Sequence, residues 1–342
     1  MEPESSEVLP EVWRLRIRSS AEYVEHVNAY LLKTGGGWTL IDTGFPDSSA
    51  QLIREVRSVT GGSRPDEVVL THIHYDHSGG SRAVAEAFGC DVRMHPGDIG
   101  VLEMVKSAVR SGHGFFDLLG VEGRVRELIR SFFERNVRLL PESLRPVNEG
   151  ERLGGKGSPW VVVHTPGHTP GHICVLNSET KALISGDHLL PRETSNVPFY
   201  PMPGYSSLRS YLRSLVKAES LGPSVVLPAH GEPFSDVTAR VDFLFEHHRR
   251  RLGEALEAMD GWVDAIGLAG SLTWSRGRFE ELGPVDTWLA VLEALSHAEF
   301  LVEIGAALPS ARGRLSYRAV SKDFGAIEGE LTKLRLSRAA GT

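Results

Sequence analysis

Short apolar stretches recur along the chain up to about residue 230, and most of them end in a polar residue or a glycine. The alternation of apolar and basic side chains from Val12 to Ile17 predicts a half-exposed strand. Further apolar runs predict strands at residues 27–32, 38–41, 67–71, 90–95, 159–164, 173–176, 181–185 and 224–228. Helical periodicity at residues 48–59, 81–88 and 208–218 separates several of these strands. Strands that alternate with helices in this way predict an α/β fold.

Between residues 98 and 140 the pattern changes to that of helices. The apolar side chains of this segment are interrupted only by glycines, so we expect a long helical insertion. Two interpretations of the insertion are open. It is either a pair of helices packed on the domain, or a lid or apolar wall over a functional site.

The composition shifts again after residue 242. A helix that starts near Phe245 carries Leu252, Leu256 and Met259 on one face. We expect further helices at residues 262–269 and 286–297, and then a β-hairpin formed by residues 300–304 and 315–320. The sequence therefore predicts a first domain at residues 1–242, which includes the insertion, and a small, mainly helical domain at residues 243–342.

The composition is that of an ordinary globular protein with an acidic excess. The chain has 342 residues, of which 41% are hydrophobic and 24% are charged, and its formal net charge is −7. This charge argues against a strongly basic surface for nucleic acid. Cys90 and Cys174 lie inside apolar strand patterns, so we expect buried thiols in a reducing compartment. Neither a signal-peptide pattern nor a bilayer-length apolar run is present, so we expect a cytoplasmic protein without a membrane partner.

Candidate metal-binding residues are densest between Thr71 and Gly80, in the predicted loop from a strand to a helix. Four potential metal ligands lie there within six positions, namely His72, His74, Asp76 and His77. The first two histidines are two residues apart, so at a strand end both imidazoles point to one side. Asp76 and His77 lie in the turn and can face a second point, which suits two metals about 3.5–4 Å apart. A histidine cluster without metal is the alternative, but burying such a cluster is costly without a cation.

Four further polar residues end apolar strands and are candidates for the same site. They are Asp42, His168, Asp187 and His230. Taken alone, each of the two aspartates has an alternative interpretation as an ordinary turn or cap residue, because each stands close to a glycine. His168 follows a Pro-Gly turn at the end of a strand, which is a geometry suited to a ligand.

Together these residues resemble the motif set of the metallo-β-lactamase-fold hydrolases. The stretch from His72 to His77 is similar to the family's HxHxDH signature, and the other motifs follow the family's order across residues 10–240. The resemblance implies an αββα sandwich. The predicted C-terminal helices and hairpin resemble, in pattern and place, the winged-helix-like module of a glyoxalase II-like subgroup of these hydrolases.

The resemblance also implies a ligand set for two metal ions. One metal would be held by His72, His74 and His168, the other by Asp76, His77 and His230, with Asp187 bridging both and Asp42 orienting the site. Ligation by nitrogen and oxygen alone suits two Zn²⁺ per chain, although Fe and Mn also accept these ligands. His74 stands where the redox-active diiron branch of the superfamily has a glutamate, which argues against that branch.

The implied activity is hydrolysis by a hydroxide that bridges the two metals, with Asp76 and Asp187 as the catalytic carboxylates. We expect this hydroxide to attack the thioester or lactone carbonyl of a hydrophobic acyl substrate, a small molecule, because the insertion and the loop after Asp187 are rich in apolar and aromatic residues. In that loop Arg192, Tyr200 and Tyr205 are candidate substrate contacts, with simple loop packing as the alternative.

Two other functions remain as alternatives. The same dinuclear site would suit an endoribonuclease or phosphodiesterase, but acidic and basic residues are balanced in the C-terminal segment, which does not favour nucleic acid. A non-catalytic metal-binding protein is the second alternative, and the intact ligand set argues against it. A homodimer is compatible with the sequence, which does not fix the oligomeric state.

Overall fold

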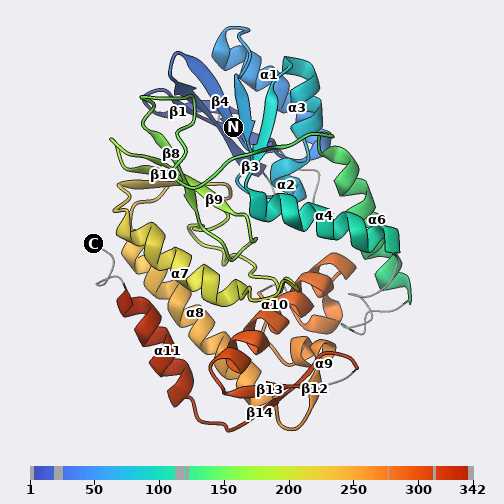
Figure 1. The fold of residues 1–342 in the computed structure, drawn as a ribbon. Coiled ribbons are helices and arrows are strands. Elements are labelled where there is room, and N and C mark those ends of the chain that lie inside the picture. The colour runs from blue at the N-terminus through green and yellow to red at the C-terminus, as the bar shows by residue number, and fades with distance from the viewer. Residues whose placement is uncertain are drawn as a thin grey trace.

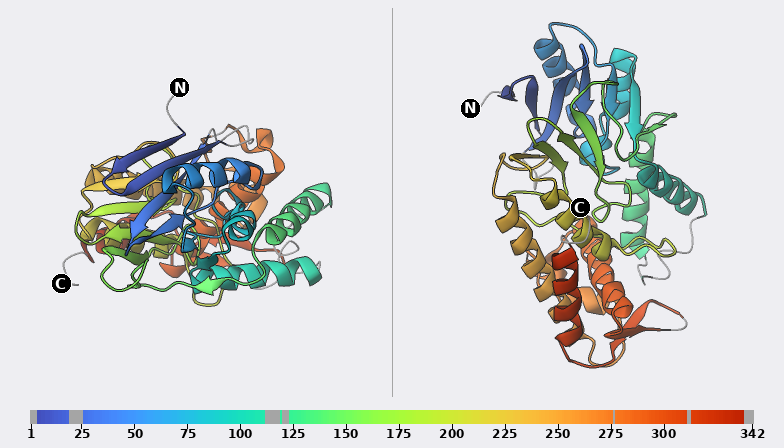
Figure 2. Two further views of the ribbon diagram at one scale, coloured as in Figure 1. Left: turned by 90° about the horizontal axis from the view of Figure 1, so that it is seen from above. Right: turned by 60° about the vertical axis from the view of Figure 1, so that its left-hand side comes forward.

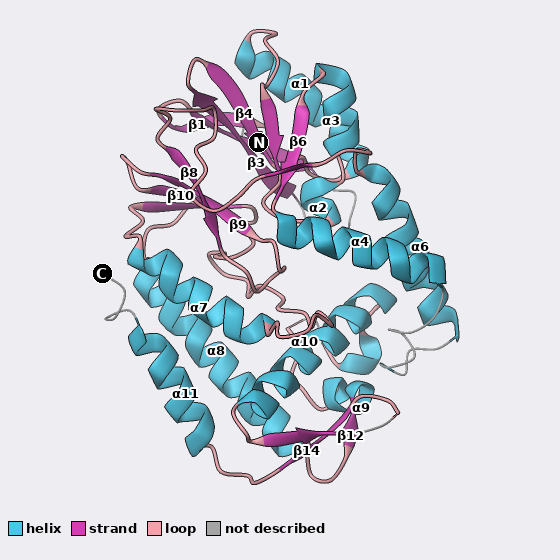
Figure 3. Ribbon diagram, in the orientation of Figure 1, coloured by secondary structure: helices cyan, strands magenta, loops and turns pink. Residues whose placement is uncertain are grey.

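Two β-sheets packed face to face, with helices on both outer faces, form the first part of the protein (Figure 1). In this computed structural model the described residues are 4–18, 26–111, 119, 123–275, 277–310 and 313–337. The second part is mainly helical and carries a small sheet of its own, as the colouring in Figure 3 shows. The right-hand view in Figure 2 shows the same division, with the long C-terminal helices below the sheets. The predicted α/β architecture, an αββα sandwich followed by a mainly helical region, is therefore confirmed.

Within the described residues, the first sheet contains seven strands in chain order. Strands β1 to β4 pair antiparallel, and β4 to β7 pair parallel. The strands are β1 (Ser5–Leu9), β2 (Val12–Arg18), β3 (His26–Thr34), β4 (Gly37–Ile41), β5 (Glu67–Val69), β6 (Asp91–Met94) and β7 (Arg145–Pro146). Helices α1 (Ser49–Thr60) and α3 (Ser81–Phe88) cover the outer face through apolar side chains such as Leu52 and Val84.

The second sheet has the strand order β11-β10-β9-β8. Its strands are β8 (Trp160–His164), β9 (Ile173–Asn177), β10 (Ala182–Gly186) and β11 (Val225–Pro228). Alternate side chains of both sheets, including Ile41 and Ile184, meet in the interior of the sandwich. The opposite face of the second sheet packs on α7 (Ser207–Ser220), with Leu183 against a cluster that contains Leu212.

The insertion contains helices α4 (Pro96–Ser111) and α6 (Gly123–Leu139), which lie against each other beside the sandwich (Figure 1). Its predicted helical character is confirmed there, whereas residues 112–118 and 120–122 lie outside the described residues. Helix α6 also contacts the C-terminal region. Two short elements, η1 (Pro46–Ser48) and α2 (Tyr75–Ser78), lie in the loops that follow β4 and β5.

The C-terminal region combines helices with a small sheet of order β12-β14-β13. Its elements are α8 (Val237–Ala258), β12 (Val263–Asp264), α9 (Ala265–Gly270), η2 (Phe279–Glu281), α10 (Pro284–Glu303), β13 (Ala307–Pro309), β14 (Ser316–Ala319) and α11 (Gly325–Leu336). The winged-helix-like character of this region stays a prediction.

In the C-terminal region the structure differs from the prediction at the start of α8 and at residues 300–304. Helix α8 begins before Phe245, because the Asp236 carboxylate caps its first turn by accepting the Ala239 N–H at 3.0 Å. One helix therefore crosses the predicted limit at residue 242, and the division into two domains stays a prediction. The strand predicted at residues 300–304 is wrong, because α10 continues to Glu303 and buries Phe300 and Leu301 completely. A short apolar run does not distinguish a strand from a buried helical turn, and β13 forms the hairpin instead.

Candidate metal centre

The predicted ligands come together at one edge of the sandwich, in the loops that follow strands β5, β8, β10 and β11. They form two groups, in each of which the ligand atoms lie within 4.8 Å of one another. The first group is His72, His74 and His168, and the second is Asp76, His77, Asp187 and His230. The loops follow strands of both sheets, so residues far apart in the sequence meet at this edge of the sandwich.

The first group consists of imidazoles that face one another closely. His72 Nε2 lies 3.1 Å from His74 Nδ1 and 3.2 Å from His168 Nε2. Burial and the neighbouring imidazoles hold the pKa of His72 well below its ordinary value, and burial first of all lowers the pKa of His74 to about 3. These imidazoles are therefore neutral near pH 7, which is the form that binds a metal.

The Asp187 carboxylate faces both groups. Its Oδ1 lies 3.4 Å from His77 Nε2 and 3.4 Å from His230 Nε2, and its Oδ2 lies 3.6 Å from His168 Nε2. His77 Nε2 and Asp187 Oδ1 are buried and, among the described residues, have no hydrogen-bond partner. Buried polar atoms without partners are costly, and a cation between these donors would satisfy them. The His and Asp cluster is thus able to hold a dinuclear metal site.

The Asp42 side chain contacts the loop after β5, which carries four of the proposed ligands. It accepts the backbone N–H of Thr71 at 2.7 Å and the Thr71 hydroxyl at 2.8 Å, and its Oδ2 lies 2.8 Å from His77 Nδ1. The residue has a φ of 62°, a conformation that costs energy in a residue other than glycine. The contact with His77 leaves Nε2 of that ring directed at Asp187, and the orienting role of Asp42 stays a prediction.

A second buried carboxylate, that of Asp98, was not predicted from the sequence. It accepts the Ile73 N–H at 2.8 Å, the Thr169 hydroxyl at 2.8 Å and the Gly171 N–H at 2.6 Å. Burial raises the pKa of Asp98 to about 7 against the lowering effect of these hydrogen bonds. A Cβ on Gly171 would lie only 2.2 Å from the Asp98 nitrogen, so only glycine fits there. The sequence offered only an acidic residue at the start of a helix, which is a common position without function.

The candidate substrate residues occupy the loop after Asp187. Arg192 is exposed, whereas Tyr200 and Tyr205 are half-buried and pack with ring centroids 6.4 Å apart. Burial first of all, and then the charge of Asp98, raises the pKa of both tyrosines. Their role as substrate contacts stays a prediction.

Two further histidines lie near the cluster. His172 Nε2 accepts the Asp187 N–H at 3.2 Å, and its Nδ1 lies 2.9 Å from the Thr165 hydroxyl. His172 therefore supports the backbone of Asp187. His188 is fully buried, and its ring packs on Tyr211 with centroids 5.2 Å apart.

Similarity to known proteins agrees with this geometry. The model of the metallo-beta-lactamase superfamily matches residues 23–230. The "Probable metallo-hydrolase YqjP" of Bacillus subtilis (strain 168) is 30% identical over 256 residues, which cover 69% of this chain and 77% of that protein. The "Atrochrysone carboxyl ACP thioesterase nsrC" of Aspergillus novofumigatus (strain IBT 16806) is 25% identical over 260 residues, 75% of this chain and 65% of that protein.

A solved structure extends the similarity to the C-terminal region. The metallo-beta-lactamase family protein TTHA1429 from Thermus thermophilus superimposes with a TM-score of 0.75 at 26% identity, over 92% of this chain and 100% of that one. None of the helices in the described part of this chain combines the length and apolar character that a bilayer span requires. By its matched domain, its fold and its cluster of histidines and aspartates, the chain belongs to the metallo-beta-lactamase superfamily.

Proposed function

We propose that this superfamily hydrolase acts on acyl thioesters or lactones with a hydrophobic acyl group, and that it uses two Zn²⁺ ions. In this site His72, His74 and His168 would hold one ion, Asp76, His77 and His230 would hold the other, and the Asp187 carboxylate faces both groups. The observation that carries the proposal is the position of Asp187, whose two oxygens face the two groups separately. Two cations bound there would make hydroxide available at neutral pH and would neutralise the negative charge that develops at the attacked carbonyl.

The carboxylates of the site stay ionised near pH 7. Burial raises the pKa of Asp76, but His77 and His230 outweigh it and bring the pKa to about 2. Neighbouring histidines likewise hold the pKa of Asp187 well below its ordinary value, in spite of its burial. Both residues can therefore ligate a cation.

A continuous row of aromatic rings supports a hydrophobic substrate. It begins at Tyr75, which stands between two proposed ligands, and Phe132 of α6 lies 5.1 Å from it between ring centroids. Phe133 continues the row and lies 6.4 Å from Trp288 of α10. The insertion thus supplies an apolar surface beside the metal loop, which favours an acyl chain over a highly charged polymer. A relative named as an acyl carrier protein thioesterase agrees with this class of substrate.

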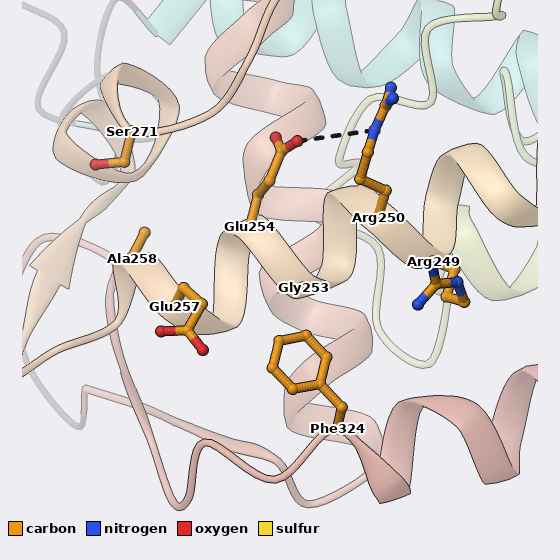
Figure 4. Close-up of a pocket in the computed structure, with 8 residues that line it drawn as sticks. All are labelled: Arg249, Arg250, Gly253, Glu254, Glu257, Ala258, Ser271 and Phe324. Atoms are coloured by element: carbon orange, nitrogen blue, oxygen red, sulfur yellow. Dashed lines mark ion pairs between the residues drawn. The ribbon is translucent and has the colours of Figure 1, made fainter.

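The phosphodiesterase alternative is weaker because cations in the described C-terminal region are balanced by carboxylates. Arg249, Arg250, Glu254 and Glu257 all line the groove between α8 and the start of α11, with Arg250 next to Glu254 (Figure 4). Arg250 Nε is 3.8 Å from Glu254 Oε1, and Arg249 Nη1 is 3.0 Å from Glu328. Binding through phosphates requires cations that are available to the nucleic acid backbone.

A parallel assay of acyl thioesters, lactones and single-stranded RNA, with metal analysis of the same preparation, tests the proposal. We expect about two metal ions per chain, zinc among them, and turnover of thioesters or lactones that increases with acyl length. RNA cleavage that persists after removal of trace nucleases, without thioester or lactone turnover, would favour the phosphodiesterase instead. A preparation with one metal or none would contradict the dinuclear site.

A further inference from the structure

One loop holds two of the proposed metal ligands by hydrogen bonds from neighbouring residues. The loop connects β10 to α7. The Ser195 hydroxyl donates to the backbone carbonyl of Asp187. The backbone carbonyl of Asn196 accepts from His168 Nδ1 at 2.7 Å. The position of this loop therefore affects both the ligand of the first group and the carboxylate between the groups.

Helix α10 of the C-terminal region fixes this loop. Asn196 Nδ2 donates to Glu293 Oε2 at 2.6 Å and lies 3.4 Å from the carbonyl oxygen of Leu289. The Phe199 N–H donates to the Leu292 carbonyl at 2.9 Å. The three acceptors fall within five consecutive positions of α10, so they belong to one short stretch of the helix. The contact between the loop and the helix is thus specific and polar.

Glu293 occupies a place in which a carboxylate is costly. Its exposed fraction is 8%, and a cation described close to it is Arg251 of α8, with Nη2 3.8 Å from Glu293 Oε1. Arg251 is itself only 2% exposed. A buried carboxylate of this kind must be paired and hydrogen-bonded to be tolerated, and its contact to Asn196 is shorter than the one to Arg251. The link to the ligand loop thus accounts for a charged residue at this position.

We propose that α10 positions the metal ligand His168 through the hydrogen-bonded chain Glu293–Asn196–His168, which makes the C-terminal region a working part of the metal centre. The inference rests on the proposed ligation by His168, but it does not depend on the substrate. With its Nδ1–H donated to the Asn196 carbonyl, His168 presents Nε2 to His72 and Asp187. Asn196 and Glu293 are positioning residues, because they act on the ligand through the loop and through each other.

The test uses the full chain, with all metal removed, and titrates it with Zn²⁺ against a chromophoric chelator. Asn196→Ala removes the amide, Glu293→Ala removes the acceptor, and Glu293→Gln keeps an acceptor oxygen without the charge. Glu303→Gln is the matched control, because Glu303 lies on the same helix but pairs with Arg209 of α7 at 2.7 Å, outside the loop. The visible absorption of the Co²⁺-loaded proteins reports the geometry of each site independently of activity.

We expect Asn196→Ala and Glu293→Ala to raise the dissociation constant of one of the two Zn²⁺ ions about 10–100-fold and to change the Co²⁺ spectrum. Glu293→Gln and the control should bind both ions as the wild type does. Wild-type affinity in Asn196→Ala, or an equal loss in the control, would overturn the inference. If Glu293→Ala does not fold, the Asn196→Ala and Glu293→Gln pair still decides. A wild-type protein that binds fewer than two ions would instead contradict the dinuclear site itself.

Discussion

Asp98 accepts the backbone N–H of Ile73 at 2.8 Å, although 25 positions separate the two residues in the chain. Ile73 stands between His72 and His74, and the same carboxylate binds Thr169 and Gly171, which follow His168 in the chain. One buried side chain therefore joins the two loops that carry the first group of proposed ligands. Asp42 contacts the first of these loops at Thr71 and at His77.

Replacing Asp98 should weaken metal binding without removing a ligand. Asp98→Ala leaves the N–H groups of Ile73 and Gly171 without their acceptor, so we expect the affinity of the first site to fall about 10–100-fold. Asp98→Asn keeps one acceptor oxygen and should lie between this variant and the wild type. Chelator competition measures the effect, and Asp91→Asn serves as control because Asp91 pairs with Arg145 at the surface. Unchanged binding of both metals by Asp98→Ala would show that the two loops hold their positions without it.

Removing the shared carboxylate should affect both groups at once. Asp187→Ala takes away the oxygens that face His77, His168 and His230, so we expect loss of hydrolysis and of at least one metal. Removing the metals from the wild type with a chelator should lower its melting temperature, because metal binding stabilises only the folded state. Metal analysis and thermal unfolding of the two proteins measure these effects. Full hydrolytic activity in metal-free wild type would be incompatible with the proposed chemistry.

The sandwich and the clustering of the proposed ligands could be predicted because both leave local signals in the sequence. Apolar runs that end in His or Asp mark strand ends. His72, His74 and His77 follow one another more closely than histidines do in an ordinary loop. Asp98 and Glu293 left no such signal. Asp98 acts on backbone N–H groups, which every residue but proline has, and Glu293 looks like one more polar residue on a helix. Their roles follow from contacts across the fold that periodicity does not contain.

Helix α10 shows the same limit for secondary structure. Residues 300–304 are apolar except for Glu303 and are β-compatible, so the local pattern favoured a strand. In the fold, Phe300 and Leu301 continue the buried face that includes Leu295 and Ala298, and packing against α8 and α9 keeps the helix intact. Tertiary burial outweighs local propensity here.

The aromatic row predicts a dependence on acyl chain length. Phe132→Ala removes the ring that contacts Tyr75, so we expect KM for long-chain acyl thioesters to rise about 10-fold, with little change for acetyl thioesters. Phe132→Leu should restore part of the effect because it restores part of the apolar surface. Leu128→Ala is the control, since Leu128 is an exposed residue of the same helix. An equal loss for short and long chains would mean that the ring supports the metal loop and not the substrate.

A buried pair of neutral histidines predicts how stability depends on pH. His248 Nδ1 lies 3.1 Å from His297 Nε2, and His297 Nδ1 lies 2.8 Å from the Glu293 carbonyl oxygen. In this chain of hydrogen bonds each imidazole ring carries one N–H proton. Burial first of all lowers the pKa of His297 to about 3 and holds that of His248 well below its ordinary value. Both rings therefore stay neutral in the folded state at pH values where the unfolded state already binds protons.

Folding lowers the pKa of each of these histidines. The folded protein is therefore fully stable above the pKa of the unfolded state and loses stability as the pH falls below that value. As the pH falls from 7 to about 5.5, each such histidine should lower the free energy of unfolding by about 1 kcal/mol. Urea unfolding of wild type and His297→Gln at several pH values, both free of metal, measures the difference. We expect the variant to be less stable at pH 7 but to lose less stability on acidification, because it lacks one group that takes up a proton on unfolding. Parallel pH profiles for the two proteins would show that His297 is protonated to the same extent in the folded and unfolded states.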